Sequence, residues 1–316
     1  MTATTATQTN AEPGFSRLVT VEPPFEPTEW PDARARQICR ELEIGHIIFF
    51  SRSPLEIPRD DREILLGRKQ SGSGYHKNIA YRPLENRVTG LDASEQREAV
   101  ELGRILREYS RQSADFLSRF LSPYGSKWNL DYASFRPIEE KGRPARLHAR
   151  NDLLHFDSFP TRPTNGARIL RFFTNINPTQ SRVWLTSQTF EAFGPRMAKA
   201  SGLLSSFKNA PLRGIRALAR ALHLPGANRP PYDDFMHRCH NAMKEDADFQ
   251  KNTPKQRWEF PPDSSWMVFT DCVSHAVLSG QYALEQTFLV SQPALVEPQR
   301  SPLAILEALA GHSLTV

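Results

Sequence analysis

Cysteine is scarce in this chain, with Cys39, Cys239 and Cys272 the three present in 316 residues. They are far apart and form none of the CxxC pairs or Cys/His clusters that structural zinc requires. A chain of this length buries a full core without cross-links. We therefore expect three reduced core cysteines in a cytoplasmic protein.

Long apolar runs are also missing. The longest candidates are short, such as residues 47–50, well below the roughly 18 apolar residues that cross a bilayer. Residues 1–14 contain no aromatic side chain and lack the charged start and apolar run of a secretory signal. We expect residues 1–14 to be a disordered tail and residues 15–316 to form a single domain.

Acidic side chains are absent from residues 192–232, which contain seven Lys or Arg. The formal net charge of the whole chain is +5, so the remainder carries −2. A nucleic-acid-binding protein would spread its basic residues more widely, whereas one basic segment indicates a local anionic partner or surface. We therefore expect no nucleic acid as a partner.

Residues 211–222 of this segment have the pattern of a basic amphipathic helix. The helix would begin at Pro211, with Arg213, Arg216 and Arg220 on one face beside an apolar face. Two interpretations stay open. The helix either packs on the fold with its arginines in water, or contacts an anionic membrane surface or lipid phosphates.

Helical patterns dominate the first 125 residues. Residues 30–50 predict a short helix, ended by Gly45, and then a strand. Residues 67–91 show no lasting periodicity and are predicted to be irregular. Residues 92–95 have a capping-box pattern and start a long amphipathic helix, which Pro123, Tyr124 and Gly125 end.

After residue 125 the pattern changes to short β-like runs separated by Pro, Gly and Asn, which is typical of a sandwich or barrel. A helical insertion at about 190–250 interrupts them. A His-bearing strand start around residue 275 lies between the last two runs. The runs are 130–136, 153–157, 167–176, 182–187, 265–270 and 285–290.

His155 and Asp157 are two residues apart in the run LLHFD, so in an extended segment both side chains point to the same face. His275, 120 residues later, is a suitable third ligand from a distant strand. Two histidines and one carboxylate form a facial triad that leaves coordination positions open for a keto-acid and dioxygen on iron(II). The spacing alone is a weak signal, because HxD occurs often by chance.

A bound 2-oxoglutarate needs a cation for its outer carboxylate. Many 2-oxoglutarate oxygenases carry a basic residue about ten positions after the distal histidine, but this chain has Glu285 there and no Lys or Arg between residues 276 and 299. Arg168 and Arg171 lie on a predicted strand, on opposite faces, and Arg136 lies on another. An arginine fork suits a carboxylate bidentately.

The composite pattern resembles the Kdo hydroxylase family, in which Kdo is a 3-deoxy-octulosonic acid. The resemblance rests on HFDSFPTRPTNGARILRFFTNINP at 155–178, on RVW at 182–184 and on the region of His275. It covers most of residues 30–295. It implies an α+β, mainly β fold with a double-stranded β-helix (jelly-roll) core, flanking N-terminal helices and the helical insertion.

The resemblance also implies an activity: an iron(II)- and 2-oxoglutarate-dependent dioxygenase that uses O2 to hydroxylate C3 of a Kdo sugar on lipid A. The iron ligands would be His155, Asp157 and His275, and the 2-oxoglutarate cations Arg171 and Arg136. Arg162 and Arg168 are candidates for the carboxylate of the sugar. A glycolipid substrate would place the protein in the cytoplasm, peripheral at the inner face of the inner membrane.

Two other functions stay open. A zinc-dependent hydrolase on a β-sandwich could use the same three ligands, although the chain has no HExxH motif and no obvious general base beside them. A non-enzymatic, cupin-like binding module would need no metal. Dependence on iron(II) and 2-oxoglutarate separates these possibilities.

Overall fold

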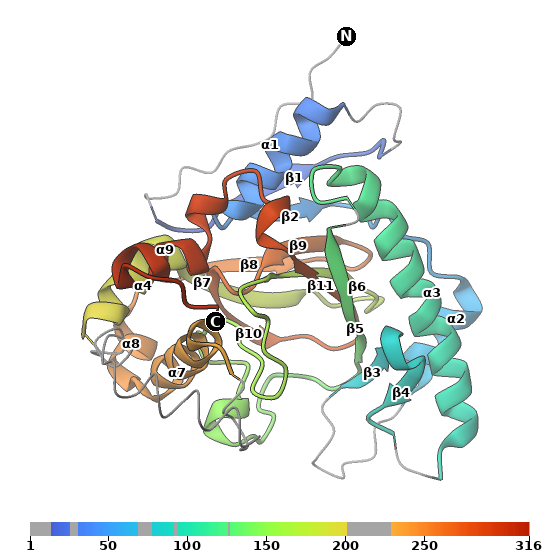
Figure 1. The fold of residues 1–316 in the computed structure, drawn as a ribbon. Coiled ribbons are helices and arrows are strands. Elements are labelled where there is room, and N and C mark those ends of the chain that lie inside the picture. Colours follow the sequence, from blue (N-terminus) through green and yellow to red (C-terminus); the bar gives the residue numbers. More distant parts are fainter. Residues whose placement is uncertain are drawn as a thin grey trace.

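The computed structural model describes residues 14–25, 31–68, 78–91, 94–125, 127–200 and 229–315. Its strands form two sheets (Figure 1). The larger has the order β1-β2-β9-β6-β11-β5-β3-β4 and the smaller the order β10-β7-β8. The strands are β1 (Leu18–Val21), β2 (Ile47–Phe50), β3 (Ile79–Arg82), β4 (Arg87–Thr89), β5 (Trp128–Arg136), β6 (Arg168–Asn175), β7 (Arg182–Thr189), β8 (Gln256–Phe260), β9 (Ser265–Phe269), β10 (Val273–Ser279) and β11 (Ala283–Val290).

The two sheets share a core. Phe173 of β6 and Trp266 of β9, from the larger sheet, pack with Trp184 of β7, from the smaller one. Phe173 and Trp266 stack with ring centroids 5.1 Å apart, and Trp184 meets both rings edge-on. Apolar side chains from two sheets that interdigitate in this way make a β-sandwich, so the expected mainly β fold is confirmed.

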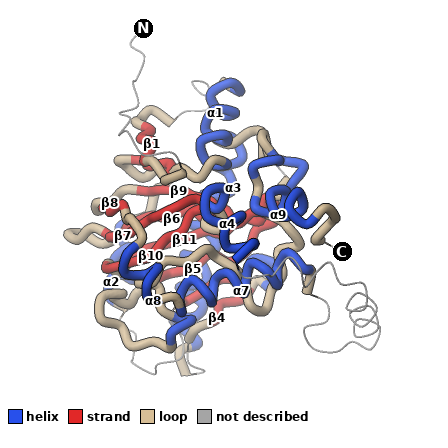
Figure 2. Tube along the Cα trace, turned by 90° about the vertical axis from the view of Figure 1, so that its left-hand side faces the viewer, coloured by secondary structure: helices blue, strands red, loops and turns tan. Residues whose placement is uncertain are grey.

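Helices cover the outside of the sandwich. α3 contacts strands of the larger sheet, and α4, α7, α8 and α9 gather on the other side of the molecule, where Figure 2 shows them in front of the strands. A second apolar core, which includes Leu106, Phe116 and Phe172, lies between α3 and the larger sheet. The helices are α1 (Asp32–Glu43), α2 (Arg59–Gly67), α3 (Gln96–Phe120), α4 (Phe190–Ala200), α7 (Pro231–Glu245), α8 (Ala247–Asn252) and α9 (Pro302–Ala310).

Several predicted elements are confirmed. α1 and β2 occupy the segment predicted as helix and strand, and Gly45 between them has a φ of +93°, a backbone conformation that favours glycine. The long helix is α3. It follows Glu95, which makes no side-chain capping bond. The capping box proposed for its start is therefore not observed among the described residues.

Two predictions for local structure are wrong. Residues 153–157 form no strand, and His155 makes only an isolated bridge with His275. Part of the segment predicted to be irregular contains β3 and β4, because β3 pairs with β5 and so gains its structure from a distant partner. The described helices between β7 and β8 lie within the predicted insertion. The proposed basic helix at 211–222 lies outside the described residues, as does the predicted tail at 1–14 except for Gly14.

Candidate metal centre and its arginine pocket

His155, Asp157 and His275 come together at one point of the sandwich. One possible ligand atom from each lies within 4.8 Å of the others. The backbone brings them there, because His155 and His275 exchange two hydrogen bonds of 3.1 and 3.0 Å and the Asp157 N–H donates to the Thr270 carbonyl. The extended HxD segment is thus attached to the start of β10 without belonging to a named strand.

Backbone carbonyls orient both imidazoles. Nδ1 of His155 lies 2.7 Å from the Leu153 oxygen, and Nδ1 of His275 lies 2.9 Å from the Val273 oxygen. In each ring Nδ1 therefore carries the proton and donates it, which leaves Nε2 with a lone pair. Burial lowers the pKa of both imidazoles, that of His155 well below its usual value. Two neutral imidazoles are what a metal ion requires.

Asp157 completes the donor set as an ionised carboxylate. Burial raises its pKa, but Arg171 and His155 outweigh burial and hold the pKa well below the usual value. Oδ2 of Asp157 lies 2.8 Å from Nε of Arg171, and Oδ1 lies 3.6 Å from Nε2 of His155. Two neutral nitrogens and one carboxylate oxygen in mutual reach fit a divalent first-row metal ion such as iron(II).

The three residues line a cavity of about 270 Å³ between the two sheets. Its walls are rich in arginine and in aromatic rings, and it is partly open to solvent. The four arginines are Arg136, Arg162, Arg171 and Arg182, the four aromatic residues are Tyr132, Phe159, Phe173 and Trp184, and the acidic residues besides Asp157 are Asp131 and Glu285. Such a cavity suits an anionic ligand with a small apolar or sugar-like body.

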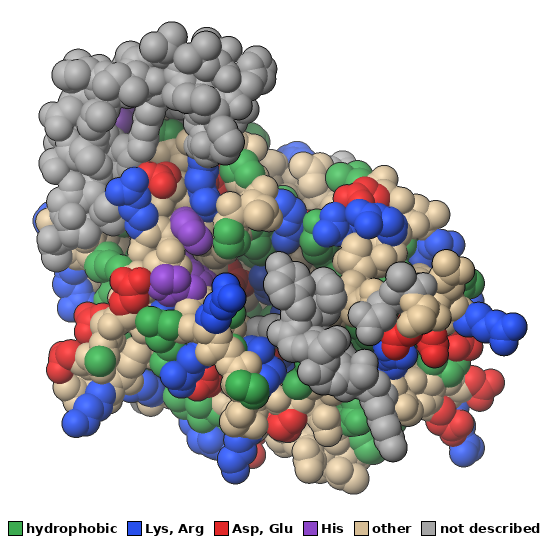
Figure 3. Space-filling model, turned by 90° about the horizontal axis from the view of Figure 1, so that it is seen from below, with side chains coloured by type: hydrophobic (Ala, Val, Ile, Leu, Met, Phe, Trp, Pro, Cys, Tyr) green, Lys and Arg blue, Asp and Glu red, His purple; other side chains and the backbone are tan. Residues whose placement is uncertain are grey.

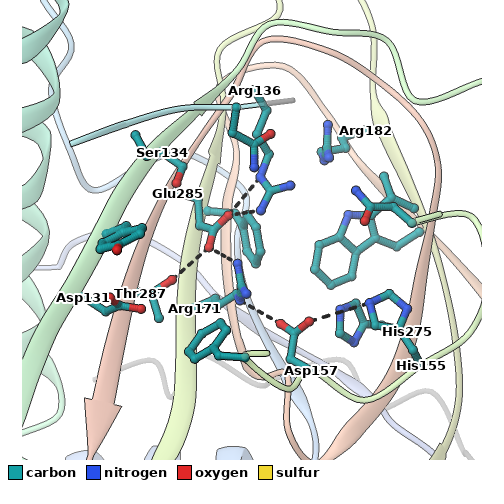
Figure 4. A pocket seen from close by; sticks show the side chains of 18 of the residues that line it. Asp131, Ser134, Arg136, His155, Asp157, Arg171, Arg182, His275, Glu285 and Thr287 are labelled. Atoms are coloured by element: carbon teal, nitrogen blue, oxygen red, sulfur yellow. Dashed lines mark hydrogen bonds and ion pairs between the residues drawn. The ribbon is translucent and has the colours of Figure 1, made fainter. Parts of the chain in front are cut away.

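Arg136 and Arg171 meet on one carboxylate, that of Glu285 (Figure 4). Nε of Arg136 donates to Oε2 of Glu285 at 2.8 Å, Nη1 of Arg171 donates to Oε1, and the Thr287 hydroxyl donates to Oε1 at 2.9 Å. Burial raises the pKa of Glu285, but Arg136 and Arg171 lower it to about 2. Both arginines predicted to bind 2-oxoglutarate are therefore already paired with a carboxylate of the protein.

Arg182 lacks such a carboxylate. It begins β7, its side chain is 1% exposed, and Nη1 donates to the Gly280 carbonyl at 2.8 Å. Its Nε and Nη2 have no hydrogen-bond partner among the described residues. Burial, with Arg136 nearby, lowers the pKa of this guanidinium to about 10, so it stays charged at neutral pH. A buried, incompletely paired cation in a cavity wall indicates a site for an anion.

Arg162 belongs to the loop that follows the HxD segment and lines the same cavity. Its guanidinium lies over the rings of Tyr132 and Phe159, at 3.8 and 4.4 Å from their centroids, and pairs with Asp131. Its side chain is 34% exposed. The predicted candidate Arg162 therefore lines the cavity and reaches solvent.

Arg168 does not line the cavity, and the prediction that it binds the sugar carboxylate is wrong. Its side chain is fully buried, pairs with Asp271 at 2.8 Å and lies over the ring of Phe269. It is three positions before Arg171 on β6, so the pleat directs the two side chains to opposite faces of the sheet. Only Arg171 faces the cavity.

Comparison with known proteins identifies the family. The model for 3-deoxy-D-manno-oct-2-ulosonic acid (Kdo) hydroxylase matches residues 26–313. The chain belongs to the Kdo hydroxylase family. A comparison with curated protein sequences gives no match.

Solved structures agree with membership of the Kdo hydroxylase family. The Kdo hydroxylase KdoO, a non-haem Fe(II) α-ketoglutarate-dependent dioxygenase, in complex with α-ketoglutarate and Fe(III), is 30% identical with a TM-score of 0.78, covering 94% of this chain and 97% of that one. Its apo and cobalt(II) forms are each 31% identical with a TM-score of 0.79 and the same coverage. The expected oxygenase fold, with its jelly-roll core, is confirmed.

The predicted class of enzyme is confirmed with the family, and neither the zinc hydrolase nor the non-enzymatic binding module is supported. None of the helices within the described ranges is long and apolar enough to cross a membrane.

Two residues that shape the charge of the cavity, Arg182 and Glu285, were not among the predicted site residues. A signal for Arg182 existed in the RVW triplet of the Kdo hydroxylase pattern. Arg182, Trp184 and Thr186 are each two residues apart on β7, so their side chains point to the same face. Thr186 pairs with His275. This register places Arg182 on the cavity side of the strand next to the metal centre.

Proposed function

We propose that the chain is an iron(II)- and 2-oxoglutarate-dependent dioxygenase that hydroxylates C3 of a Kdo sugar in a Kdo-containing glycolipid, with His155, Asp157 and His275 as the iron ligands. The observation that carries the proposal is the convergence of these three donors on the wall of an arginine-rich cavity. Such a donor set leaves positions for a bidentate keto-acid and for O2. With iron(II) bound, oxidative decarboxylation of 2-oxoglutarate by O2 gives succinate and CO2 and inserts one oxygen atom into a substrate C–H bond.

We propose that the outer carboxylate of 2-oxoglutarate binds at Arg182 and Arg136. Arg182 has two nitrogens without a hydrogen-bond partner, and Arg136 contacts the ring of Phe173 and, among the described residues, pairs with the carboxylate of Glu285. Arg171 takes the position next to Asp157. The guanidinium groups of these three arginines lie near two carboxylates, those of Asp157 and Glu285. The resulting surplus of positive charge attracts a dicarboxylate.

The sugar is assigned to the side of the cavity formed by Arg162, Tyr132 and Phe159. A Kdo sugar carries a carboxylate, which suits the arginine fork, and a ring whose C–H groups pack on aromatic faces. Asp131 holds Arg162 and contributes a second buried oxygen, Oδ2, without a hydrogen-bond partner among the described residues. This oxygen can accept a hydrogen bond from a sugar hydroxyl. The two residues orient the sugar, and orientation is the main task left to the protein.

We further propose that residues 15–316 act as one domain in the cytoplasm, peripheral at the inner face of the inner membrane. A glycolipid substrate and the basic pattern of residues 211–222 support this location. Arg213, Arg216 and Arg220 would contact anionic headgroups.

The proposal is tested by anaerobic titration of the protein with iron(II) and 2-oxoglutarate, followed by the weak visible charge-transfer band of the chelate. We expect the band in wild type and in a His148→Ala control, because His148 is half exposed and pairs with Glu245 outside the cavity. We expect its loss in His155→Ala. Activity on Kdo-lipid A should require both additions and release succinate. A band that persists in His155→Ala removes this residue from the ligand set.

A further inference from the structure

Glu285 places a carboxylate of the protein between two arginines of the cavity, where the carboxylate of a ligand could otherwise bind. Its side chain is 1% exposed, and Arg136 and Arg171 approach it from β5 and β6, the two strands that flank β11. Thr287, two residues further along the same strand face, donates a third hydrogen bond. All these partners line the cavity, so Glu285 is built into the site and is not an isolated core ion pair.

Arg171 connects this carboxylate to the metal centre. Its Nη1 hydrogen-bonds Glu285, while its Nε lies 2.8 Å from Oδ2 of Asp157. The contact with Asp157 is an ion pair without an aligned hydrogen bond, because Nε has no hydrogen-bond partner by geometry. Glu285 therefore holds the guanidinium by a directional hydrogen bond, while Asp157 attracts it as a charge.

An unrestrained arginine beside a carboxylate takes a different geometry. The planar fork of a guanidinium prefers to donate two parallel hydrogen bonds to both carboxylate oxygens. Such an arrangement at Asp157 would occupy Oδ1 as well as Oδ2, although Oδ1 is the oxygen nearer to His155. Metal ion and arginine would then compete for the same oxygen.

We propose that Glu285 is a positioning residue for the metal centre: by binding Nη1 of Arg171 it confines that arginine to one side of Asp157 and leaves Oδ1 for the metal ion. The inference rests on the proposed function, because it takes Asp157 as a metal ligand. It gives a role to an acidic residue at the position where many related oxygenases have a basic one.

The test measures Co(II) binding by visible absorption and by equilibrium dialysis, without turnover. Glu285→Ala and Glu285→Gln remove the charge that restrains Arg171. Partners of metal ligands change metal affinity by about 10–100-fold, and we expect a weakening of that size in both variants. Excess formate should restore Co(II) affinity in Glu285→Ala, where it fills the vacated carboxylate position. It should not do so in Glu285→Gln, where the amide still occupies the space.

Asp61→Asn is the matched control. Asp61 is likewise a buried carboxylate paired with an arginine, Arg104, but it lies outside the cavity. We expect this variant to lower the melting temperature and to leave Co(II) affinity and its response to formate unchanged. If a Glu285 variant folds poorly, the rise in melting temperature caused by Co(II), measured with and without formate, gives the same comparison.

The outcomes separate this inference from the proposed function. Wild type that binds no Co(II) would contradict both. Wild type and both Glu285 variants that bind Co(II) equally would overturn the positioning role alone. Weakened binding in Glu285→Ala that formate does not restore would also overturn it, because a carboxylate at that position would then not be the cause.

Discussion

Among the described residues, Arg182 is the cavity arginine that makes no direct ion pair, and Glu140, Glu285 and Glu139 act on it only from farther away. A buried charge without a counter-ion destabilises the folded state unless a ligand supplies one. Arg182→Met keeps a flexible, unbranched side chain about as long as the aliphatic stem of arginine and removes the guanidinium with its charge. We expect the KM for 2-oxoglutarate to rise about 10–150-fold, since hydrogen bonds to charged groups contribute about 1.5–3 kcal/mol. Steady-state kinetics at saturating iron(II) measure this KM in wild type and variant.

The same variant distinguishes a ligand site from a structural ion pair. If Arg182 serves the ligand, Arg182→Met should melt at a temperature no lower than that of the ligand-free wild type, because a costly buried charge has gone. Arg168→Met is the comparison: Arg168 pairs with buried Asp271, so its loss leaves a carboxylate uncompensated and should cost about 3–5 kcal/mol. A large drop in melting temperature for Arg182→Met with an unchanged KM would contradict the assignment.

At the scale of residues, the predicted site residues that depend on short spacings along the chain could be found from the sequence. His155 and Asp157 could be paired because two positions of extended chain place both side chains on one face. The sequence could not show that Arg168 pairs with Asp271, or that Arg171 pairs with Glu285, because these partners are 103 and 114 positions apart. Whether an arginine is available to a ligand depends on such distant carboxylates, so the arginine roles were the part that needed the structure.

The turn between β10 and β11 is the element that fixes Arg182. Gly280 in this turn has a φ of +109°, and its carbonyl accepts the hydrogen bond from Nη1 of Arg182. A Cβ at this position would lie 2.8 Å from Cα of Arg182. The turn therefore requires glycine both for its conformation and for the close approach of β7.

Gly280→Ala should disturb the turn and the cavity together. Backbone strain of this kind costs about 1–3 kcal/mol, and the clash with β7 adds to it. We expect a lower free energy of unfolding in urea and a raised KM for 2-oxoglutarate. Gly142→Ala is the control, since Gly142 has a φ of +72° but an added Cβ would meet nothing within 4 Å. It should cost less stability and leave the KM unchanged. Equal effects of the two substitutions would show that the approach to β7 does not matter.

At the scale of elements, several with a strong pattern of their own were predicted, although the helices α2 and α9 were not. α3 has a long amphipathic repeat, and β5, β6 and β11 have apolar runs, so their sequences suffice. β3 and β4 are short and follow a polar segment, and they form a strand pair because β3 adds to the edge of β5. The HxD segment was predicted as a strand for the opposite reason: it has the apolar neighbours and alternation of a strand, but within residues 153–157 His155 alone pairs with β10.

At the scale of the whole molecule, basic and histidine side chains lie close together on the face seen in Figure 3. A glycolipid remains in its membrane while its sugar enters a cavity, so the enzyme must approach an anionic surface. The sequence places seven Lys or Arg and no acidic residue at 192–232. We therefore expect binding to vesicles that contain phosphatidylglycerol and little binding to pure phosphatidylcholine vesicles.

Charge reversal tests which segment is responsible. Each basic residue near an anionic surface contributes about 1 kcal/mol. Replacing Arg213, Arg216 and Arg220 with Glu should therefore lower the affinity for anionic vesicles, measured by co-sedimentation, by about 100-fold or more. Reversing the exposed Arg36, Arg40 and Arg119 changes the net charge equally at α1 and α3 and should have a much smaller effect. Binding by wild type should also fall as salt rises, because screening shortens the reach of the attraction. Equal, salt-insensitive binding by both triple variants would end the membrane hypothesis and would leave the glycolipid to be recognised through the cavity alone.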